Sequence, residues 1–441
     1  MADGLTARAL AERIASGALS ARAAVDACLE RIAERDGVVK AFVHLSPEHA
    51  RAQADALDTH RRSGRPIGPL HGVPVAVKDI IDTQDYLTEN GTPLDKGRRP
   101  REDATLVRRL RAAGAVIIGK TVSTEFAYFH PGPTTNPHNP AHTPGGSSSG
   151  SAAAVGDGMV PLAIGTQTSG SVIRPAAFCG TVGYKPTHGA VPLTGVLSIA
   201  PSLDTIGVFA RNLGDAALLA ELMMGADGRD ERTVPAPVPN LVAAALERPP
   251  VKPTLAIVKG PTWDEADGDT VGLIEEIAHV LGERADMVDL PSPYDDVMEY
   301  QRRVMTVGFA HELRAYRARG KSAISEAMRE AMAEGASTPV TDYLAARDMQ
   351  TALRRGFDEV FDRYDAIITP SAPGEAPEGI GSTGRPVFNA MWSFVGAPCI
   401  TLPVAKGSRG LPLGIQLVGR YGEDARLMRM ANWLSETLAA A

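Results

Sequence analysis

The chain has few cysteines, few aromatic residues and no long apolar run. Of its 441 residues only three are cysteine, Cys28, Cys179 and Cys399, and they lie far apart with no CxxC pair. This excludes a disulfide framework and a CxxC metal site. No apolar run approaches the ~18 residues of a membrane span, and the first residues, MADGLTARALAERIASG, are polar. The sequence therefore predicts no membrane partner and a cytoplasmic location.

An excess of charge of one sign is also lacking. Lys plus Arg number 45 and Asp plus Glu number 52, for a net charge of −7, and neither sign forms a block. A chain that binds nucleic acid would carry a basic stripe with interleaved aromatic residues, and aromatic residues make up only 5% here. We expect no nucleic-acid partner.

Glycine, proline and apolar residues are plentiful. The 44 glycines and 33 prolines indicate many tight turns, and a hydrophobic content of 44% is enough for a large core. Strand-like and helix-like segments alternate along the chain, which is typical of an α/β layered fold.

Ser20 and Asp103 are expected to cap two of the helices. Helices are expected at 5–63, 103–113, 212–225, most of 264–365 and from Glu423 onward, and strands at 70–77, 115–118, 252–258, 366–368, 399–404 and 414–418.

The segment from Gly145 to Pro186 carries the strongest chemical signal. Two serine-bearing glycine turns, GGSSSG and TSGSVIRP, flank an apolar segment, and a lysine lies upstream in the valine-rich GVPVAVKD. Serine is a poor nucleophile until a base takes its proton. A lysine kept neutral by burial is such a base, and it acts directly or through a second hydroxyl. The combination indicates an enzyme.

Three other interpretations of the glycine-rich segments compete with this one. GAVIIGKT, from Gly114 to Thr121, matches the phosphate-loop pattern, but its centre has the pattern of a buried strand where that loop needs an exposed backbone. Gly146 to Gly150 matches the nucleophile elbow G-x-S-x-G, which needs a preceding strand and a later acid and histidine. Because His188, His279 and His311 follow, the elbow stays a weaker alternative. A flexible linker fits the composition of GGSSSGS but not the apolar helix-then-strand pattern after it.

Together these motifs resemble the amidase signature family, whose members hydrolyse amides with a Ser–cis-Ser–Lys triad. The resemblance rests on GVPVAVKD, GGSSSGSAAAV, TSGSVIRPAAFCGTVGYKPT and residues 388–419, in the family's order. It implies that Lys78 is the base, Ser147 the cis-serine that relays the proton, and Ser171 the nucleophile. The spacing of the two serines favours Ser147 over the serines that follow it.

The resemblance also implies the fold: a single large α/β/α domain around a mixed β-sheet, with N-terminal helices. We expect residues 1–64 to form a helical segment packed on the core. Residues 65–441 would form the amidase signature domain, more helical and variable at about 220–365. The N-terminal helices often mediate dimerisation in relatives, so a homodimer is the expected assembly.

Three positions depart from the pattern of many relatives. Ser149 replaces a glycine, Gln167 replaces an acid, and Ser169 replaces a glycine of the loop that the resemblance assigns to the oxyanion hole. A side chain at 169 is expected to narrow the pocket without abolishing activity, because the donors are backbone amides. The candidate donors are the backbone N–H groups of Thr168, Ser169, Gly170 and Ser171.

An arginine follows the predicted nucleophile by three residues. This SVIRP spacing of Arg174 resembles the malonamidase branch, in which the arginine holds a substrate carboxylate, a task suited to a bidentate guanidinium. A structural arginine that binds a buried acid or a loop carbonyl is the alternative. Tyr128, in TEFAYFHPG, is expected either to line the pocket or to belong to the core.

The predicted function is hydrolysis of a small-molecule carboxamide to acid and ammonia through a serine acyl-enzyme, with a carboxylate-bearing half-amide as one candidate substrate. No metal or organic cofactor is required. An amidotransferase A-type subunit is one alternative, against which the SVIR spacing speaks because that subunit has SIRQ. A general aryl or aliphatic amidase is another. A non-catalytic ligand-binding relative is disfavoured by the presence of all three catalytic residue types.

Overall fold

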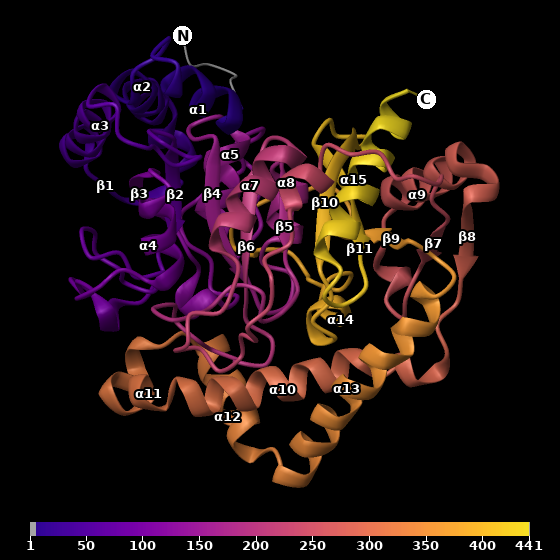
Figure 1. Ribbon diagram of the computed structural model, residues 1–441. Coiled ribbons are helices and arrows are strands. Elements are labelled where there is room, and N and C mark those ends of the chain that lie inside the picture. The colour runs from indigo at the N-terminus through magenta and orange to yellow at the C-terminus, as the bar shows by residue number, and fades with distance from the viewer. Residues whose placement is uncertain (1–5, 441) are drawn as a thin grey trace.

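A single mixed β-sheet forms the centre of the molecule in the computed structural model, which describes residues 6–440 (Figure 1). Its eleven strands lie in the order β1-β3-β2-β4-β6-β5-β10-β11-β9-β7-β8. The expected α/β class with a mixed sheet is confirmed. The strands are β1 Phe42–Leu45, β2 Pro74–Lys78, β3 Val116–Thr121, β4 Leu162–Gln167, β5 Val182–Lys185, β6 Thr205–Ala210, β7 Leu255–Val258, β8 Ala285–Val288, β9 Ala366–Pro370, β10 Cys399–Lys406 and β11 Pro412–Val418.

Helices surround this sheet. The α1–α3 group lies beside β1 and β3 at one end of the sheet, and α10–α13 run along its lower edge in the view of Figure 1. They are α1 Ala7–Ala15, α2 Ala21–Val39, α3 Pro47–Arg62, α4 Thr105–Ala112, α5 Ser149–Gly156, α6 Ile173–Phe178, α7 Leu213–Met223, α8 Leu241–Ala244, α9 Gly268–Leu281, α10 Val297–Glu312, α11 Arg314–Gly320, α12 Glu326–Ser337, α13 Val340–Phe361, α14 Ala390–Phe394 and α15 Asp424–Ala439.

The direction of three neighbouring strands brings distant motifs together. β2 runs parallel to β3 on one side and to β4 on the other, with Val77 opposite Ile164. Because parallel strands end at the same edge of a sheet, the last residue of β2, Lys78, and the loop that follows Gln167 at the end of β4 lie at one edge. This edge is where the predicted site residues meet.

Near the N-terminus the prediction of uninterrupted helical structure is wrong at one place. Strand β1 lies between α2 and α3 and pairs antiparallel with β3 at the edge of the sheet. A strand of four residues is too short for its alternation to stand out in the sequence. The expected cap at Ser20 is confirmed, because its side chain accepts from Ala23 N–H.

Asp103 does not cap the helix that follows it. The N-cap of α4 is Ala104, without a side-chain bond. Instead, the Asp103 carboxylate accepts from Gln84 N–H at 2.8 Å and pairs with Arg111 Nε at 2.9 Å. A carboxylate can be satisfied by a neighbouring loop as well as by a helix terminus, and the sequence does not distinguish the two.

Residues 264–365 are largely helical, as expected, but strand β8 interrupts them and extends the sheet beside β7. Helix α10 packs against α12, α13 and α14. The crossing of α10 and α12 is close, since a Cβ added at Gly335 would lie 1.9 Å from Thr306 O. None of the helices within residues 6–440 is long and apolar enough to cross a membrane.

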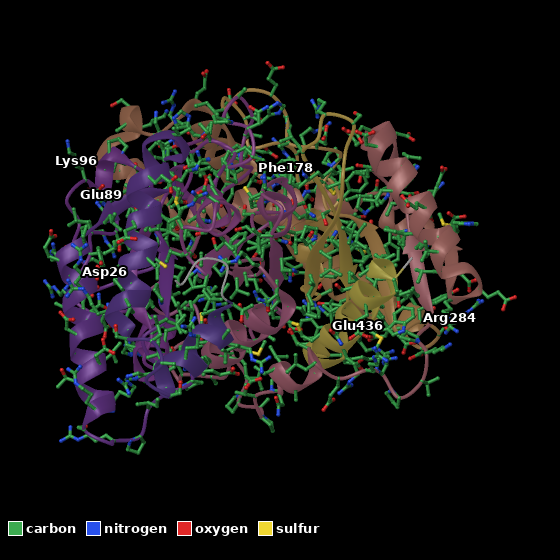
Figure 2. The ribbon with its side chains drawn as sticks, turned by 90° about the horizontal axis from the view of Figure 1, so that it is seen from above. Asp26, Glu89, Lys96, Phe178, Arg284 and Glu436 are labelled. Carbon is green, nitrogen blue, oxygen red and sulfur yellow. The ribbon has the colours of Figure 1, made fainter. Side chains whose placement is uncertain are left out.

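Side chains fill the space between the helices and the sheet (Figure 2). Phe178 is buried at 1% exposure among them, whereas Lys96 lies at the exposed periphery. One continuous apolar core extends from α1 to α15. The strand that ends at Lys78 is therefore part of this buried core.

Gly335→Ala is expected to destabilise the fold by about 1–3 kcal/mol, because the added methyl group would overlap the α10 backbone. Urea or thermal unfolding measures the change. Gly272→Ala, on α9, is the matched control: a Cβ there meets no atom within 4 Å, and alanine favours a helix over glycine by about 1 kcal/mol. Equal stabilities of the two variants would contradict the close crossing of α10 and α12.

Candidate active site

Lys78 lies at the end of a central strand and is completely buried. Its Nζ donates to three hydroxyl oxygens: Ser147 Oγ at 2.8 Å, Thr166 Oγ1 at 2.9 Å and Ser148 Oγ at 3.1 Å. No carboxylate of the described residues lies within ion-pair distance of it. Burial therefore lowers the pKa of Lys78 well below 10.5, opposed only by the more distant charge of Asp204.

The neighbouring acid, Asp79, is directed away from Lys78, as expected for successive residues of an extended chain. Its carboxylate accepts from Glu89 N–H at 3.2 Å and lies 3.9 Å from Lys120 Nζ. Burial raises the pKa of Asp79 to about 7. The acid beside Lys78 in the sequence is thus engaged elsewhere.

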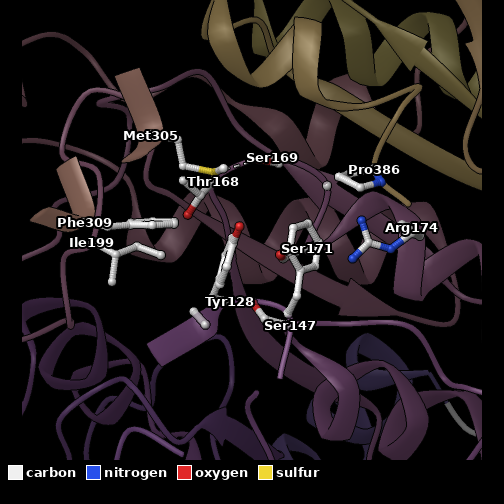
Figure 3. Close-up of a pocket in the computed structure, with 13 residues that line it drawn as sticks. Tyr128, Ser147, Thr168, Ser169, Ser171, Arg174, Ile199, Met305, Phe309 and Pro386 are labelled. Atoms are coloured by element: carbon white, nitrogen blue, oxygen red, sulfur yellow. Dashed lines mark hydrogen bonds between the residues drawn. The ribbon is translucent and has the colours of Figure 1, made fainter. Parts of the chain in front are cut away.

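The two serines at the centre of the prediction line the same pocket (Figure 3). Gly145 has a φ of 81° and is followed by a cis peptide bond between Gly146 and Ser147, after which α5 begins. Ser171 follows β4 through a short loop and precedes α6. The Ser147 hydroxyl faces Lys78, and no hydrogen bond joins it to the Ser171 hydroxyl. The structure brings Lys78, Ser147 and Ser171 to one place.

The loop of residues 168–171 lines the pocket. None of these four N–H groups donates a hydrogen bond to any residue between 6 and 440. The loop is held by other atoms: Gln167 Oε1 accepts from Val172 N–H at 2.8 Å, and Ser393 Oγ donates to Ser169 O at 2.5 Å. Such unpaired, fixed donors are what an oxyanion hole requires.

The competing interpretations of the glycine-rich segments do not agree with the structure. Val116–Thr121 is a fully buried strand, so no phosphate loop exists there. No strand enters the turn at Gly146, and no histidine of the described residues lines the pocket of Ser147 and Ser171. GGSSSGS is buried and leads into α5, so it is not a linker.

Comparison with known proteins agrees with this geometry. The family model described as Amidase matches residues 23–428. The chain belongs to the amidase family. It is therefore an amidase, a hydrolase of carbon–nitrogen bonds, and this part of the prediction is confirmed.

Curated relatives match along nearly the whole chain. The A subunit of the glutamyl-tRNA(Gln) amidotransferase of Synechococcus sp. (strain WH7803) is 34% identical over 463 residues, covering 96% of this chain and 94% of the relative. The same protein of Salinispora arenicola (strain CNS-205) is 34% identical over 484 residues, covering 97% and 96%. These relatives do not place this amidase in the malonamidase branch. They favour the alternative of an amidotransferase A-type subunit, against which the SVIR spacing speaks.

Solved structures of related proteins have the same fold. One is described as an unexpected vestigial protein complex that reveals the evolutionary origins of an s-triazine catabolic enzyme; it has a TM-score of 0.91 at 29% identity over 98% of both chains. The native peptide amidase of Stenotrophomonas maltophilia has a TM-score of 0.84 at 30% identity over 99% of this chain and 97% of its own.

In this amidase Arg174 is buried, and part of its guanidinium group is hydrogen-bonded while one amino group is not. Its Nε donates to Thr383 O at 2.8 Å and its Nη2 to Gly146 O at 2.6 Å, the carbonyl of the cis peptide bond. Its Nη1 is buried with no hydrogen-bond partner among the described residues. Arg174 also lines the pocket and lies beside Ser171 in Figure 3. The loop-carbonyl role is thus present, while one amino group is left unused.

Tyr128 lines the pocket, and its ring packs edge-on against Phe309 with centroids 4.9 Å apart. The two residues before it, Phe126 and Ala127, have positive φ values of 47° and 57°. Left-handed backbone at two consecutive non-glycine residues costs free energy and persists where surrounding contacts enforce it. Phe126 N–H donates to Asn90 O at 2.9 Å, which fixes this turn. The strained turn positions Tyr128.

Several residues at the site were not predicted from the sequence. Ser148 and Thr166 contact Lys78 directly, and Asp204 accepts from Thr168 Oγ1 at 2.7 Å. Gln301 donates to Ser169 Oγ at 2.8 Å from helix α10. Short polar residues in strands and loops carry no local signal, and these contacts depend on chain segments that are distant in sequence.

For an amide substrate, kcat/KM is expected to rise from acid to mildly alkaline pH. A lysine base works only when neutral, and burial lowers the pKa of Lys78 well below 10.5, so the rising limb should lie well below that pH. Steady-state rates from about pH 5 to 9 measure it, with circular dichroism as the control for folding. A flat profile with chemistry rate-limiting would count against Lys78 as the titrating base.

Proposed function

We propose that this amidase hydrolyses a small carboxamide to an acid and ammonia through a serine acyl-enzyme. Ser171 Oγ attacks the amide carbonyl, while its proton passes to Ser147 Oγ and that of Ser147 passes to neutral Lys78. The 2.8 Å bond between Lys78 Nζ and Ser147 Oγ is the single observation that carries the proposal. A buried amine without a carboxylate partner is a base at neutral pH.

The attack gives a tetrahedral oxyanion, for which the N–H groups of residues 168–171 are the candidate donors. They are unpaired in the part of the chain that the structure describes. Loss of one such donor typically raises the barrier by about 2.7–4 kcal/mol. When the carbon–nitrogen bond breaks, the relayed proton goes to the leaving nitrogen and ammonia departs. Water then attacks the acyl-enzyme by the reverse relay and releases the acid.

For the substrate we propose an amide that also bears a carboxylate, held by Arg174 Nη1. Burial lowers the pKa of Arg174 to about 9, so the group is cationic at neutral pH although no carboxylate of the described residues pairs with it. A buried charge without a partner is costly, and an unused donor at the pocket is complementary to an anionic group. A substrate carboxylate would satisfy both.

An amidotransferase A-type subunit is the second candidate, and the curated relatives favour it over a self-sufficient amidase. Glutamine is itself an amide that bears a carboxylate, so Arg174 suits both candidates. Glutamine also carries an ammonium group, which calls for an acidic partner. Arg174, Arg302 and Arg385 line the pocket and the cavity beside it, and no Asp or Glu of the described residues does. This charge pattern favours an anionic amide over glutamine.

The expected cytoplasmic location and homodimer stay predictions under either candidate.

Ser171→Ala and Lys78→Ala are each expected to reduce kcat by roughly 10⁴-fold or more, because members of a triad act as a unit. Ser147→Ala should leave a small residual rate, since water can replace its hydroxyl in the relay. Ammonia release from a primary amide measures all three. Substantial activity in purified Ser171→Ala protein would refute the assignment of the nucleophile.

A preference for amides with a carboxylate is expected from the unused donor of Arg174. Ammonia release from a short dicarboxylic half-amide should exceed that from its neutral analogue by about tenfold or more in kcat/KM, which corresponds to about 1.4 kcal/mol. The comparison varies the substrate and not Arg174, because Arg174 also binds the Gly146 carbonyl. Ser171→Ala is run beside the wild type to exclude contaminating activity.

L-Glutamine is the third substrate of that comparison and separates the two candidates. Rapid hydrolysis of the half-amide by the purified chain alone supports the self-sufficient amidase. A preference for glutamine, or activity that depends on added partner subunits, supports the amidotransferase role. Equal rates with half-amide and neutral amide would make Arg174 structural and indicate a general amidase.

A further inference from the structure

The side chain of Ser169 lies where two cavities meet. The inner pocket contains Ser147 and Ser171 and is narrow. A larger outer cavity opens between α10 and residues 381–390. Both are lined by the same boundary residues, which are Tyr128, Phe129, Ser169, Met305 and Pro386. The two cavities are therefore neighbours, and these five residues lie between them or along their common edge.

Among the five boundary residues, the side chain of Ser169 forms hydrogen bonds with side chains of helix α10. Gln301 Nε2 donates to Ser169 Oγ at 2.8 Å, and that hydroxyl donates to Met305 Sδ at 3.4 Å. Gln301 is buried at 3% exposure and lines the outer cavity. No other side chain of α10 forms a hydrogen bond with the loop of residues 168–171 among the described residues.

The backbone of the loop does not need a glycine at 169. Ser169 has no positive φ, so its side chain introduces no left-handed strain. Gly170 is different, because a Cβ there would lie 2.5 Å from Asn389 Oδ1. The Ser169 carbonyl is held separately by Ser393. The backbone conformation of the loop therefore does not depend on the residue type at 169, and the Ser169 side chain is hydrogen-bonded to α10.

We propose that Ser169 and Gln301 form a partition that limits the length of the acyl group. While these two side chains are in place, the acyl group must fit within the inner pocket, so the substrates are amides of short acids. Without them, the inner pocket and the outer cavity join into one channel along Met298 and Arg302 of α10. This inference rests on the proposed serine acyl-enzyme and adds a residue pair that determines its specificity.

The test is the acyl-length profile of Ser169→Gly and Gln301→Ala against the wild type. The probes are unbranched primary amides from propanamide to octanamide, together with half-amides of the corresponding dicarboxylic acids. In Ser169→Gly the ratio of kcat/KM for octanamide to that for propanamide should rise at least about tenfold, since the fit of methylene groups in a pocket is worth about 10–200-fold. Gln301→Ala should shift the ratio in the same direction, and Ser169→Thr should shift it toward short amides.

The octanamide-to-propanamide ratio of kcat/KM distinguishes a limit on acyl length from a general effect of the substitution on the loop. If Ser169 only positioned the oxyanion donors, its variants would lower kcat for every amide alike and leave the ratio unchanged. Gln350→Ala is the matched control: this buried glutamine of α13 binds Phe394 O and lines neither cavity, so its loss should reduce stability without changing the ratio.

Two failures are distinguishable in this experiment. A wild type that hydrolyses short amides, with an unchanged ratio in Ser169→Gly and Gln301→Ala, overturns the partition and leaves the proposed hydrolysis standing. A wild type that hydrolyses no amide of either series overturns the proposed function, and the partition with it.

Discussion

A lysine buried without a carboxylate partner is the constraint on which the rest of the site depends. Burying an ammonium group in an apolar interior is costly, so the proton is given up instead. Lys78 is surrounded by neutral hydroxyls, and the acid next to it in the sequence is engaged by Lys120 and Glu89. An ion pair at Lys78 would hold the proton and remove the base. The position of Asp79 is therefore as important to the proposed chemistry as the position of Lys78.

A second requirement is that backbone amides stay unpaired in a buried loop. Proteins usually satisfy buried N–H groups, so the loop of residues 168–171 must be fixed by its other atoms. Gln167, Ser393 and Asp204 supply these contacts from a strand, a short helix and a loop. Arg174 does the same for Gly146, and its Nη1 has no hydrogen-bond partner among the described residues. The donors remain available because other contacts keep the loop in place.

The family is shown by nearly the whole chain, whereas the substrate that we propose depends on the pocket alone. The relatives match nearly the whole chain, and the match extends to proteins described as amidotransferase subunits and as a peptide amidase. Helix α10, within the helical part that follows β8, contributes Met305 and Phe309 to the lining of the pocket that contains Ser171. In our proposal, side chains on that helix limit the acyl group, and overall similarity to the relatives does not reveal them.

The sequence by itself determined the α/β class, the family and three residues, Lys78, Ser147 and Ser171, that the structure brings to one place. Glycine turns, a lysine in a valine-rich strand and serines at fixed spacing are local patterns, and local patterns can be recognised without a structure. It misplaced short elements such as β1 and the cap at Asp103, because few residues carry little pattern.

Only the tertiary structure decided what lies next to these residues. The hydroxyl of Thr166 beside Lys78, the double environment of Arg174 and the bond from Gln301 to Ser169 all join segments that are remote in the chain. Sheet register and helix packing set such contacts, since they depend on many side chains at once. For that reason the amidase class could be predicted from the sequence, whereas the surroundings of the site residues could not.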